Sequence, residues 1–301
     1  MTDIRFKWLI TAVENGQLLR VFLRENKLIS RKALADIKFK GGSITVDGRH
    51  ETVRYLLNEG ETVEVTFPPE EVSEWIRPVS IPLDIIFEDD HLLVINKPPY
   101  LPTIPSRDQS EESLAGAVIY FFQQKGIPST FHAVNRLDRD TSGLLLIAKH
   151  RYVHDLFSQL QKKKKIERTY RALVHGTLAE NEGIIDLPIG KKSDSIIERE
   201  VSLEGQRAVT HFSVEKRFKE VTLVKVRLET GRTHQIRVHF SHLGHPLIGD
   251  TLYGGYREGL NRQGLHSSDL SFYHPIADKD ITLNIPLYND MKEKIKTLEK
   301  N

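Results

Sequence analysis

The chain has 301 residues and a formal net charge of +2 at pH 7, with 39% hydrophobic and 28% charged residues. Those proportions are typical of a globular protein and exclude a collagen-like or low-complexity chain, while the length predicts two folded units. The absence of cysteine excludes disulfides, thiol nucleophiles and thiolate zinc sites. No run reaches the roughly 18 apolar residues of a membrane span, and charges interrupt the first residues, so we expect a cytoplasmic protein.

The first segments predict two helices flanked by strands. A strand is expected over residues 4–13. The apolar positions of the helix that follows are Leu18, Leu19, Phe22 and Leu23. Ser30 can cap a second helix, which should end at Gly41-Gly42. The alternating segments on either side of Asp47-Gly48 predict a type I′ hairpin, and a further strand is expected over residues 62–65.

This arrangement resembles the small αL RNA-binding module first described in a ribosomal small-subunit protein. The resemblance places a set of basic side chains on the RNA-facing side: Arg31, Lys32, Lys38 and Lys40. Pro68-Pro69, two glutamates and two further prolines then break regular structure. We therefore expect an αL-type RNA-binding module at residues 1–75, a linker at 76–82 and a second, catalytic domain at 83–301.

Strand patterns outnumber helical patterns in the second domain. Strands are expected at residues 85–88, 92–96, 143–148, 170–174, 210–217, 222–228 and 234–239. Helices are expected at residues 113–124 and 153–161. Because strands and helices do not alternate regularly, the pattern favours an α+β fold with a mixed, largely antiparallel sheet over a doubly wound parallel sheet.

A polar turn at residues 135–143 stands just before an apolar strand. Within it Arg136 and Arg139 bracket Asp138 beside an apolar leucine. Cations in those positions would hold a carboxylate in its ionised form. The alternative is an ordinary tight turn, in which polar side chains satisfy backbone donors. That alternative explains the end of the segment but not the two arginines.

Residues 136–143, Arg-Leu-Asp-Arg-Asp-Thr-Ser-Gly, resemble the signature of the RluA-type pseudouridine synthases. Further segments resemble other blocks of that family, in the same order along the chain: 86–99, 168–176, 228–239 and 244–250. Together they span roughly residues 83–287. Because several ordered blocks are far more specific than one motif, the sequence is identified as a member of this family, which implies the pseudouridine synthase fold.

The resemblance implies that Asp138 is the catalytic aspartate, that Tyr170 stacks near the target and that Arg237 pairs with the aspartate. It further implies that Arg136 enters the gap left by a flipped base. Other side chains of these blocks and of the αL module are expected to contact RNA: Arg139, Arg232, His234, Arg31 and Lys32. The family usually has histidine before Arg136, whereas this chain has Asn135, and the departure bears on target choice more than on chemistry.

Pseudouridine formation breaks the bond between ribose carbon and uracil nitrogen, turns the base and rejoins it through carbon 5. Asp138 could act as a nucleophile or as a base that removes a sugar proton, and both routes stay open. A low pKa favoured by Arg237 would keep that carboxylate ionised. We expect the target base to be flipped out of its stack, at a cost of about a few kcal/mol. Arg136 would replace the lost stacking, and Tyr170 would hold the uracil by stacking worth roughly 1 to 3 kcal/mol.

Two other clusters admit alternative interpretations. Four histidines raise the alternative of a metal site: His234, His239, His242 and His245. On the expected strand His234 and His239 would face opposite sides, so we expect no metal and favour phosphate or backbone contacts. No dinucleotide, Walker or serine-hydrolase motif is present, so we expect no cofactor. The lysine run at residues 162–165, followed by Arg168 and Arg171, could neutralise several phosphates or be a solvated helix end.

Two functions remain open from the sequence. The first is an RNA pseudouridine synthase, an isomerase that converts specific uridines in ribosomal RNA, foremost that of the large subunit, or in transfer RNA. The second is a noncatalytic RNA-binding or ribosome-assembly factor on the same fold. The presence of Asp138, Tyr170 and Arg237 favours the enzyme. We expect it to act on structured RNA as a monomer.

Overall fold

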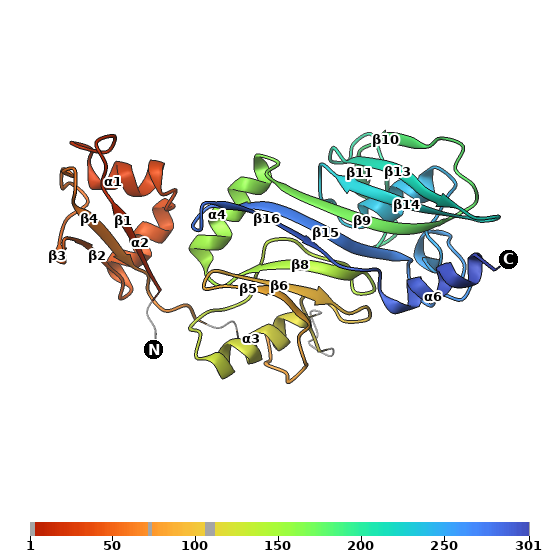
Figure 1. Cartoon of the computed structure of the whole chain (residues 1–301), viewed down its shortest axis with the longest axis horizontal. Coiled ribbons are helices and arrows are strands. Elements are labelled where there is room, and N and C mark those ends of the chain that lie inside the picture. Colours follow the sequence, from red (N-terminus) through yellow and green to blue (C-terminus); the bar gives the residue numbers. More distant parts are fainter. Residues whose placement is uncertain (1–3, 72–73, 106–111, 301) are drawn as a thin grey trace.

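The computed structural model describes residues 4–71, 74–105 and 112–300. A small N-terminal unit stands beside a larger domain that is built on one long sheet (Figure 1). Within the described residues, no helix is long and apolar enough to cross a bilayer.

The N-terminal unit contains a four-stranded antiparallel sheet with strand order β1-β4-β2-β3. Ser30 Oγ accepts the N–H of Ala33 at 3.1 Å, which confirms the predicted helix cap. Asp47 and Gly48 have φ values of 45° and 78°, as a type I′ turn requires. The elements are β1 (Arg5–Leu9), α1 (Leu19–Val21), a π-helical turn (Phe22–Asn26), α2 (Arg31–Phe39), β2 (Ser43–Val46), β3 (Arg49–His50) and β4 (Thr62–Thr66).

Two N-terminal elements differ from the sequence prediction. The strand expected over residues 4–13 ends at Leu9, because the Glu14 carboxylate accepts the backbone N–H and the hydroxyl of Thr11 and closes a turn there. The first helix has three α-helical residues and then widens, since the N–H of Lys27 bonds to the carbonyl of Phe22, five residues back, at 3.0 Å.

The larger domain is organised around a mixed sheet in which β8 and β15 form the parallel pair and the other described pairs are antiparallel. The predicted α+β fold with a largely antiparallel sheet is confirmed. The strand order is β10-β13-β14-β9-β15-β8-β6-β5, with β16 beside β15 and β7 beside β8. The elements are β5 (Ile85–Glu88), β6 (Leu92–Lys97), α3 (Leu114–Lys125), β7 (His132–Ala133), β8 (Ser142–Ala148), α4 (Arg151–Lys162), β9 (Ile166–His175), β10 (Glu182–Asp186), β11 (Ile189–Lys191), β12 (Arg199–Val201), β13 (Val209–Arg217), β14 (Val221–Leu228), α5 (Gln235–His242), a 3-10 turn (Thr251–Tyr253), β15 (Leu265–His274), β16 (Lys279–Asn284) and α6 (Asn289–Leu298).

Helices cover both faces of the sheet at β6 and β8, which explains why these strands are apolar at nearly every position. Leu93 and Leu145 belong to the same core cluster as Val118 of α3. The alternate residues of β6 and β8 belong instead to a cluster that includes Val153 and Phe157 of α4. Figure 1 shows α3 and α4 on different sides of this part of the sheet. The polar turn before β8 is therefore attached to a rigid, fully covered strand.

One strand predicted from the sequence is wrong. Residues 235–239, expected in a strand at 234–239, form the start of helix α5 (Gln235–His242). Ile236 and Phe240, four residues apart, are buried in the same core cluster, which is helical rather than alternating spacing. His234 begins the helix from a left-handed conformation with a φ of 59°.

Elements near the end of the chain, including the central strand β15, were not predicted from the sequence. That strand carries several polar side chains that are buried: His266, Ser267 and Ser268. His266 Nδ1 lies 2.9 Å from Ser142 Oγ, and Ser268 Oγ donates to Asp269 at 2.5 Å. Because these buried positions are polar, no hydrophobic alternation marks the strand.

The N-terminal unit and the larger domain share one hydrophobic core cluster. The Phe6 ring lies 5.0 Å from Tyr152 and 5.4 Å from His91, measured between ring centroids. The Tyr152 hydroxyl donates to the carbonyl of Lys27 at 2.6 Å. Residues 68–71 and 74–84 form no helix or strand. Glu70 Oε2 in this segment lies 2.5 Å from Nε2 of His132 in the larger domain. The division into 1–75, 76–82 and 83–301 stays a prediction.

Gly143 permits the close approach of β8 and β15. Its φ is +113°, and a Cβ atom at this position would lie 2.2 Å from the carbonyl oxygen of Ser267. We expect Gly143→Ala to lower the free energy of unfolding by about 3 to 5 kcal/mol, measured by urea denaturation. The matched control is Gly126→Ala at the end of α3, where φ is +66° and no atom lies within 4 Å, so about 1 kcal/mol is expected. Equal losses in the two variants would contradict the steric argument.

Candidate active site

A cavity of about 620 Å³ lies where the polar turn before β8 meets β9 and the start of α5. It collects most of the site residues predicted from the sequence: Arg136, Asp138, Arg139, Tyr170, Arg232, His234 and Arg237. Arg31 and Lys32 are not among its lining residues, and both are exposed in the first turn of α2. The structure thus joins segments almost 100 residues apart into one site.

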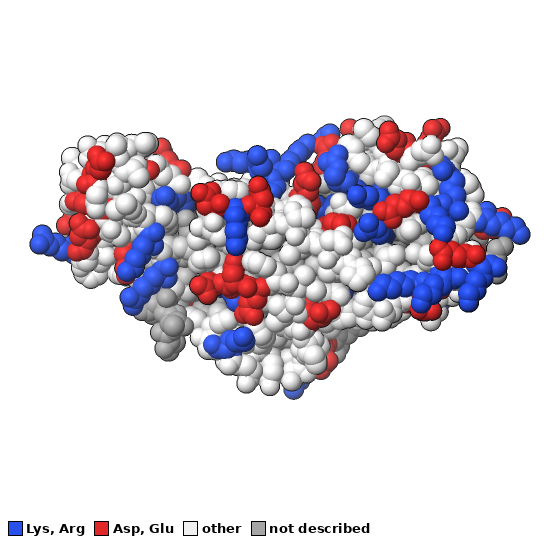
Figure 2. All heavy atoms as spheres, viewed as in Figure 1, with Lys and Arg blue, Asp and Glu red and all other residues white. Residues whose placement is uncertain are grey.

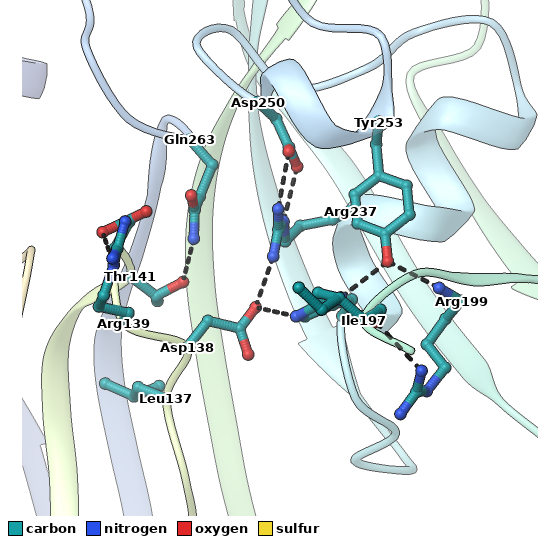
Figure 3. Close-up of polar contacts among 12 residues, drawn as sticks. Leu137, Asp138, Arg139, Thr141, Ile197, Arg199, Arg237, Asp250, Tyr253 and Gln263 are labelled. Atoms are coloured by element: carbon teal, nitrogen blue, oxygen red, sulfur yellow. Dashed lines mark hydrogen bonds and ion pairs between the residues drawn. The ribbon is translucent and has the colours of Figure 1, made fainter. Parts of the chain in front are cut away.

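Arg237 bridges two carboxylates at one side of the cavity (Figure 3). Its Nη1 atom donates to Asp138 Oδ2 at 3.2 Å. Its Nε and Nη2 atoms donate to the two oxygens of Asp250 at 2.6 and 2.8 Å. Burial opposes the charge of Arg237, but hydrogen bonds and charges from Asp250 and Asp138 together raise its pKa above the ordinary value. The guanidinium is therefore a fixed cation aimed at Asp138.

A second group of contacts forms around His234. His234 Nε2 lies 3.8 Å from Asp138 Oδ2, and its Nδ1 lies 2.7 Å from the hydroxyl of Tyr253. That hydroxyl accepts the N–H of Arg199 at 2.9 Å, so its own hydrogen can be donated to Nδ1, which leaves the Nε2 hydrogen facing Asp138. Burial lowers the pKa of His234, which fits a neutral imidazole.

The turn that carries Asp138 is held by its backbone carbonyls. Lys97 is fully buried, and its Nζ atom donates to the carbonyl of Arg139 at 2.9 Å, while burial lowers its pKa to about 7. Arg262, also fully buried, donates to the carbonyl of Asp140 at 3.0 Å. Thr103 Oγ1 donates to the carbonyl of Leu137 at 2.6 Å. Three carbonyls around Asp138 are thus fixed, and its side chain has a defined direction.

Four residues around the site had no role predicted from the sequence: Asp250, Tyr253, Lys97 and Arg262. Asp250 and Lys97 lie inside segments that resemble family blocks, so the sequence placed them near the site without showing their contacts. Asp250 is 1% exposed, and a buried aspartate needs a partner. Its burial is a property of the folded chain, so the sequence did not show that a partner was required. Nothing in the sequence pointed to Tyr253 or Arg262.

Tyr170 and Asn135 occupy buried positions in the site. Tyr170 is 4% exposed, and burial raises the pKa of its phenol. Asn135 Oδ1 accepts the backbone N–H of Leu146 at 2.9 Å, so this side chain closes the turn against β8. Arg136, in contrast, is exposed at the cavity.

The four histidines at residues 234–245 do not lie on a strand. The prediction that His234 and His239 face opposite sides of a strand was therefore wrong. On α5, His239 contacts Thr210 Oγ1 and the carbonyl of Leu187, at 2.8 and 2.9 Å. His245 Nδ1 lies 2.8 Å from the carbonyl of His175. These are the backbone and hydroxyl contacts of structural histidines.

Comparisons with known proteins agree on one family. A model of the RNA pseudouridylate synthase family matches residues 91–242. The uncharacterized RNA pseudouridine synthase YjbO of Bacillus subtilis (strain 168) is 52% identical over 89% of this chain and 95% of its own. The ribosomal large subunit pseudouridine synthase D of Vibrio cholerae is 36% identical over 84% of this chain and 82% of its own. The solved structure of human RNA pseudouridylate synthase domain containing 4 has a TM-score of 0.59 at 22% identity, covers 71% of this chain and 92% of its own, and supports the fold.

We expect Asp250→Asn to lower the free energy of unfolding by about 3 to 5 kcal/mol, because it removes the bidentate partner of a buried arginine. The matched control is Glu215→Gln, which weakens the ion pair with Arg171 near the surface and should cost at most about 1 kcal/mol. Urea denaturation of both variants measures the difference. A loss for Asp250→Asn no larger than that of the control would show that Asp250 does not anchor Arg237.

Proposed function

Because this chain belongs to the RluA-type RNA pseudouridine synthase family, we propose that it isomerises specific uridines of ribosomal or transfer RNA with Asp138 as the essential carboxylate. The observation that carries the proposal is the Asp138 carboxylate beside the fixed cation of Arg237, at 3.2 Å, within a cavity of about 620 Å³. Relatives named for the ribosomal large subunit favour large-subunit RNA as the target. The reaction involves no redox change. We propose that the enzyme acts in the cytoplasm as a monomer and needs no cofactor.

One oxygen of Asp138 is proposed to react while the other is held. Arg237 and His234 both face Oδ2, and within the described residues no hydrogen bond joins Oδ1 to the protein. Figure 3 shows the dashed contacts of Asp138 on one side of its carboxylate. The free oxygen could attack the sugar or the base of the bound uridine, or could remove a sugar proton, and the geometry serves either route.

The target uridine must leave its stack to bring its sugar linkage to Asp138. Tyr170 is proposed to hold the flipped base by stacking at the cavity wall. Arg136, exposed at the same cavity, is proposed to fill the gap in the RNA with its guanidinium plane. Arg139, Arg232 and His234 line the cavity as well and would contact the surrounding RNA.

Other basic side chains would guide RNA to the cavity. Figure 2 shows Lys and Arg side chains projecting near the turn between α4 and β9, where residues 162–165 are exposed. Gln161, which immediately precedes them, lines the cavity. Lys164 pairs with Glu229, so the run is not wholly available for phosphates. We propose that this run and the αL module extend the contact with structured RNA.

We predict that Asp138→Asn abolishes pseudouridine formation and leaves RNA affinity within about tenfold, because it removes chemistry rather than phosphate contacts. Chemical mapping of pseudouridine in ribosomal and transfer RNA from cells with and without the gene, complemented by wild type or variant, measures the first effect. Asp140→Asn, in the same turn, is the matched control and should restore the sites. Loss of no site in the deleted cells would favour the noncatalytic RNA-binding alternative.

The αL assignment predicts that replacing Arg31 and Lys32 together with glutamine weakens RNA binding and lowers the slope of log K against log salt by roughly 1.4 to 1.8, because each phosphate contact contributes about 0.7 to 0.9. The charge-matched control replaces Lys279 and Lys296, which are exposed in the larger domain. Binding is measured by filter retention across a salt series. If both double variants change the slope equally, the N-terminal cations have no specific role.

A further inference from the structure

Arg168 is a buried cation that no carboxylate holds. Its residue is 7% exposed, and its Nε atom is buried without a hydrogen-bond partner. Other arginines of the domain differ: Arg171 pairs with Glu215 and Asp269, and Arg262 pairs with Asp290. Within the described residues, no ion pair of the Arg168 side chain is found. Because an uncompensated buried charge is costly, its position calls for an anion from outside the protein.

The side chain of Arg168 faces the candidate active site. Arg168 and Tyr170 are two positions apart on β9 and therefore share one face of the strand, and both line the cavity. Burial raises the pKa of the Tyr170 phenol, while the charge of Arg168 opposes this rise and that of Asp138 adds to it, so both charged groups lie close enough to the phenol to act on it. Arg168 and the candidate catalytic carboxylate of Asp138 thus line the same cavity.

The head of Arg168 lies beside the turn that leads into α5. A Cβ atom added to Gly231 would stand 3.4 Å from Nη2 and 3.5 Å from Nη1 of Arg168, in ordinary contact. Because residue 231 has no side chain, this end of the guanidinium is not covered by it. Arg232, the next residue, is exposed at the same cavity. The guanidinium of Arg168 therefore lies beside the segment of Gly231 and Arg232, which both line the cavity.

We propose that Arg168 binds a backbone phosphate flanking the target uridine once the base has entered the cavity. The proposal rests on the proposed function. A planar guanidinium matches the geometry of a phosphate, which can accept two parallel N–H bonds, and an anion supplied by RNA would compensate the buried charge only in the complex. Arg168 would then fix the ribose between its phosphate and Tyr170, with Asp138 beside the sugar linkage.

The test uses short RNAs that contain the uridine identified by chemical mapping. Every RNA is 2′-O-methylated around the target, and each member of the series has one linkage neutralised as a methylphosphonate. Dissociation constants are measured for the full-length wild type and Arg168→Gln. We expect Arg168→Gln to weaken binding of the 2′-O-methylated RNA with all its phosphates intact about tenfold. The variant should be insensitive to the one flanking linkage whose neutralisation weakens binding by the wild type by a similar factor.

Arg171→Gln is the matched control, because Arg171 is on the same strand but three positions away and faces the opposite side, where it pairs with Glu215 and Asp269. It should keep the wild-type sensitivity to every linkage. Arg168→Gln should also unfold at a temperature no lower than the wild type, since it removes an uncompensated charge, whereas a structural arginine would lower it. Arg168→Gln that responds to each linkage as the wild type does would overturn the proposal. A wild type that neither binds nor converts these RNAs would instead contradict the proposed function.

Discussion

The bidentate ion pair between Arg237 and Asp250 decides where the Asp138 carboxylate, the proposed reactive group, can be. Asp250 is almost fully buried and uses both oxygens on Arg237, so the plane of the guanidinium is fixed before it meets Asp138. Two carboxylates therefore share one guanidinium. Asp138 is thereby positioned for its proposed action on a sugar carbon or on a proton.

The turn beneath Asp138 is supported in a different way, by buried basic side chains that donate hydrogen bonds to backbone carbonyls. Lys97 and Arg262 reach the carbonyls of Arg139 and Asp140 from within the protein. Arg262 also binds both oxygens of Asp290 in the first turn of α6, so the C-terminal helix takes part in holding the turn. Such preorganisation matters for catalysis because the groups need not rearrange when charge develops.

Local signals in the sequence predicted local structure well. The Ser30 cap, the Asp47-Gly48 turn and most strands of the larger domain depend on near neighbours or on apolar alternation, and the structure confirms them. The start of α5 was predicted as a strand because a short apolar segment does not show its period clearly, and its spacing is settled by packing on the sheet. Asp138 and Arg237 were brought together only by the family resemblance, and the bond from Arg237 to Asp250 depends on tertiary contacts that no local pattern carries. Arg168 was visible in the sequence, but its lack of a partner is a property of the folded chain alone.

The parallel pairing of β8 with β15 has a consequence for the order in which the protein assembles during translation. The turn that carries Asp138 precedes β8, whereas its neighbour β15 and the support from Asp290 are synthesised more than 120 residues later. Contacts so distant in sequence form late, after the intervening chain has closed a long loop. A nascent chain whose N-terminal unit has already left the ribosome would therefore still lack a competent active site, and modification would begin only after the ribosome has nearly finished the polypeptide.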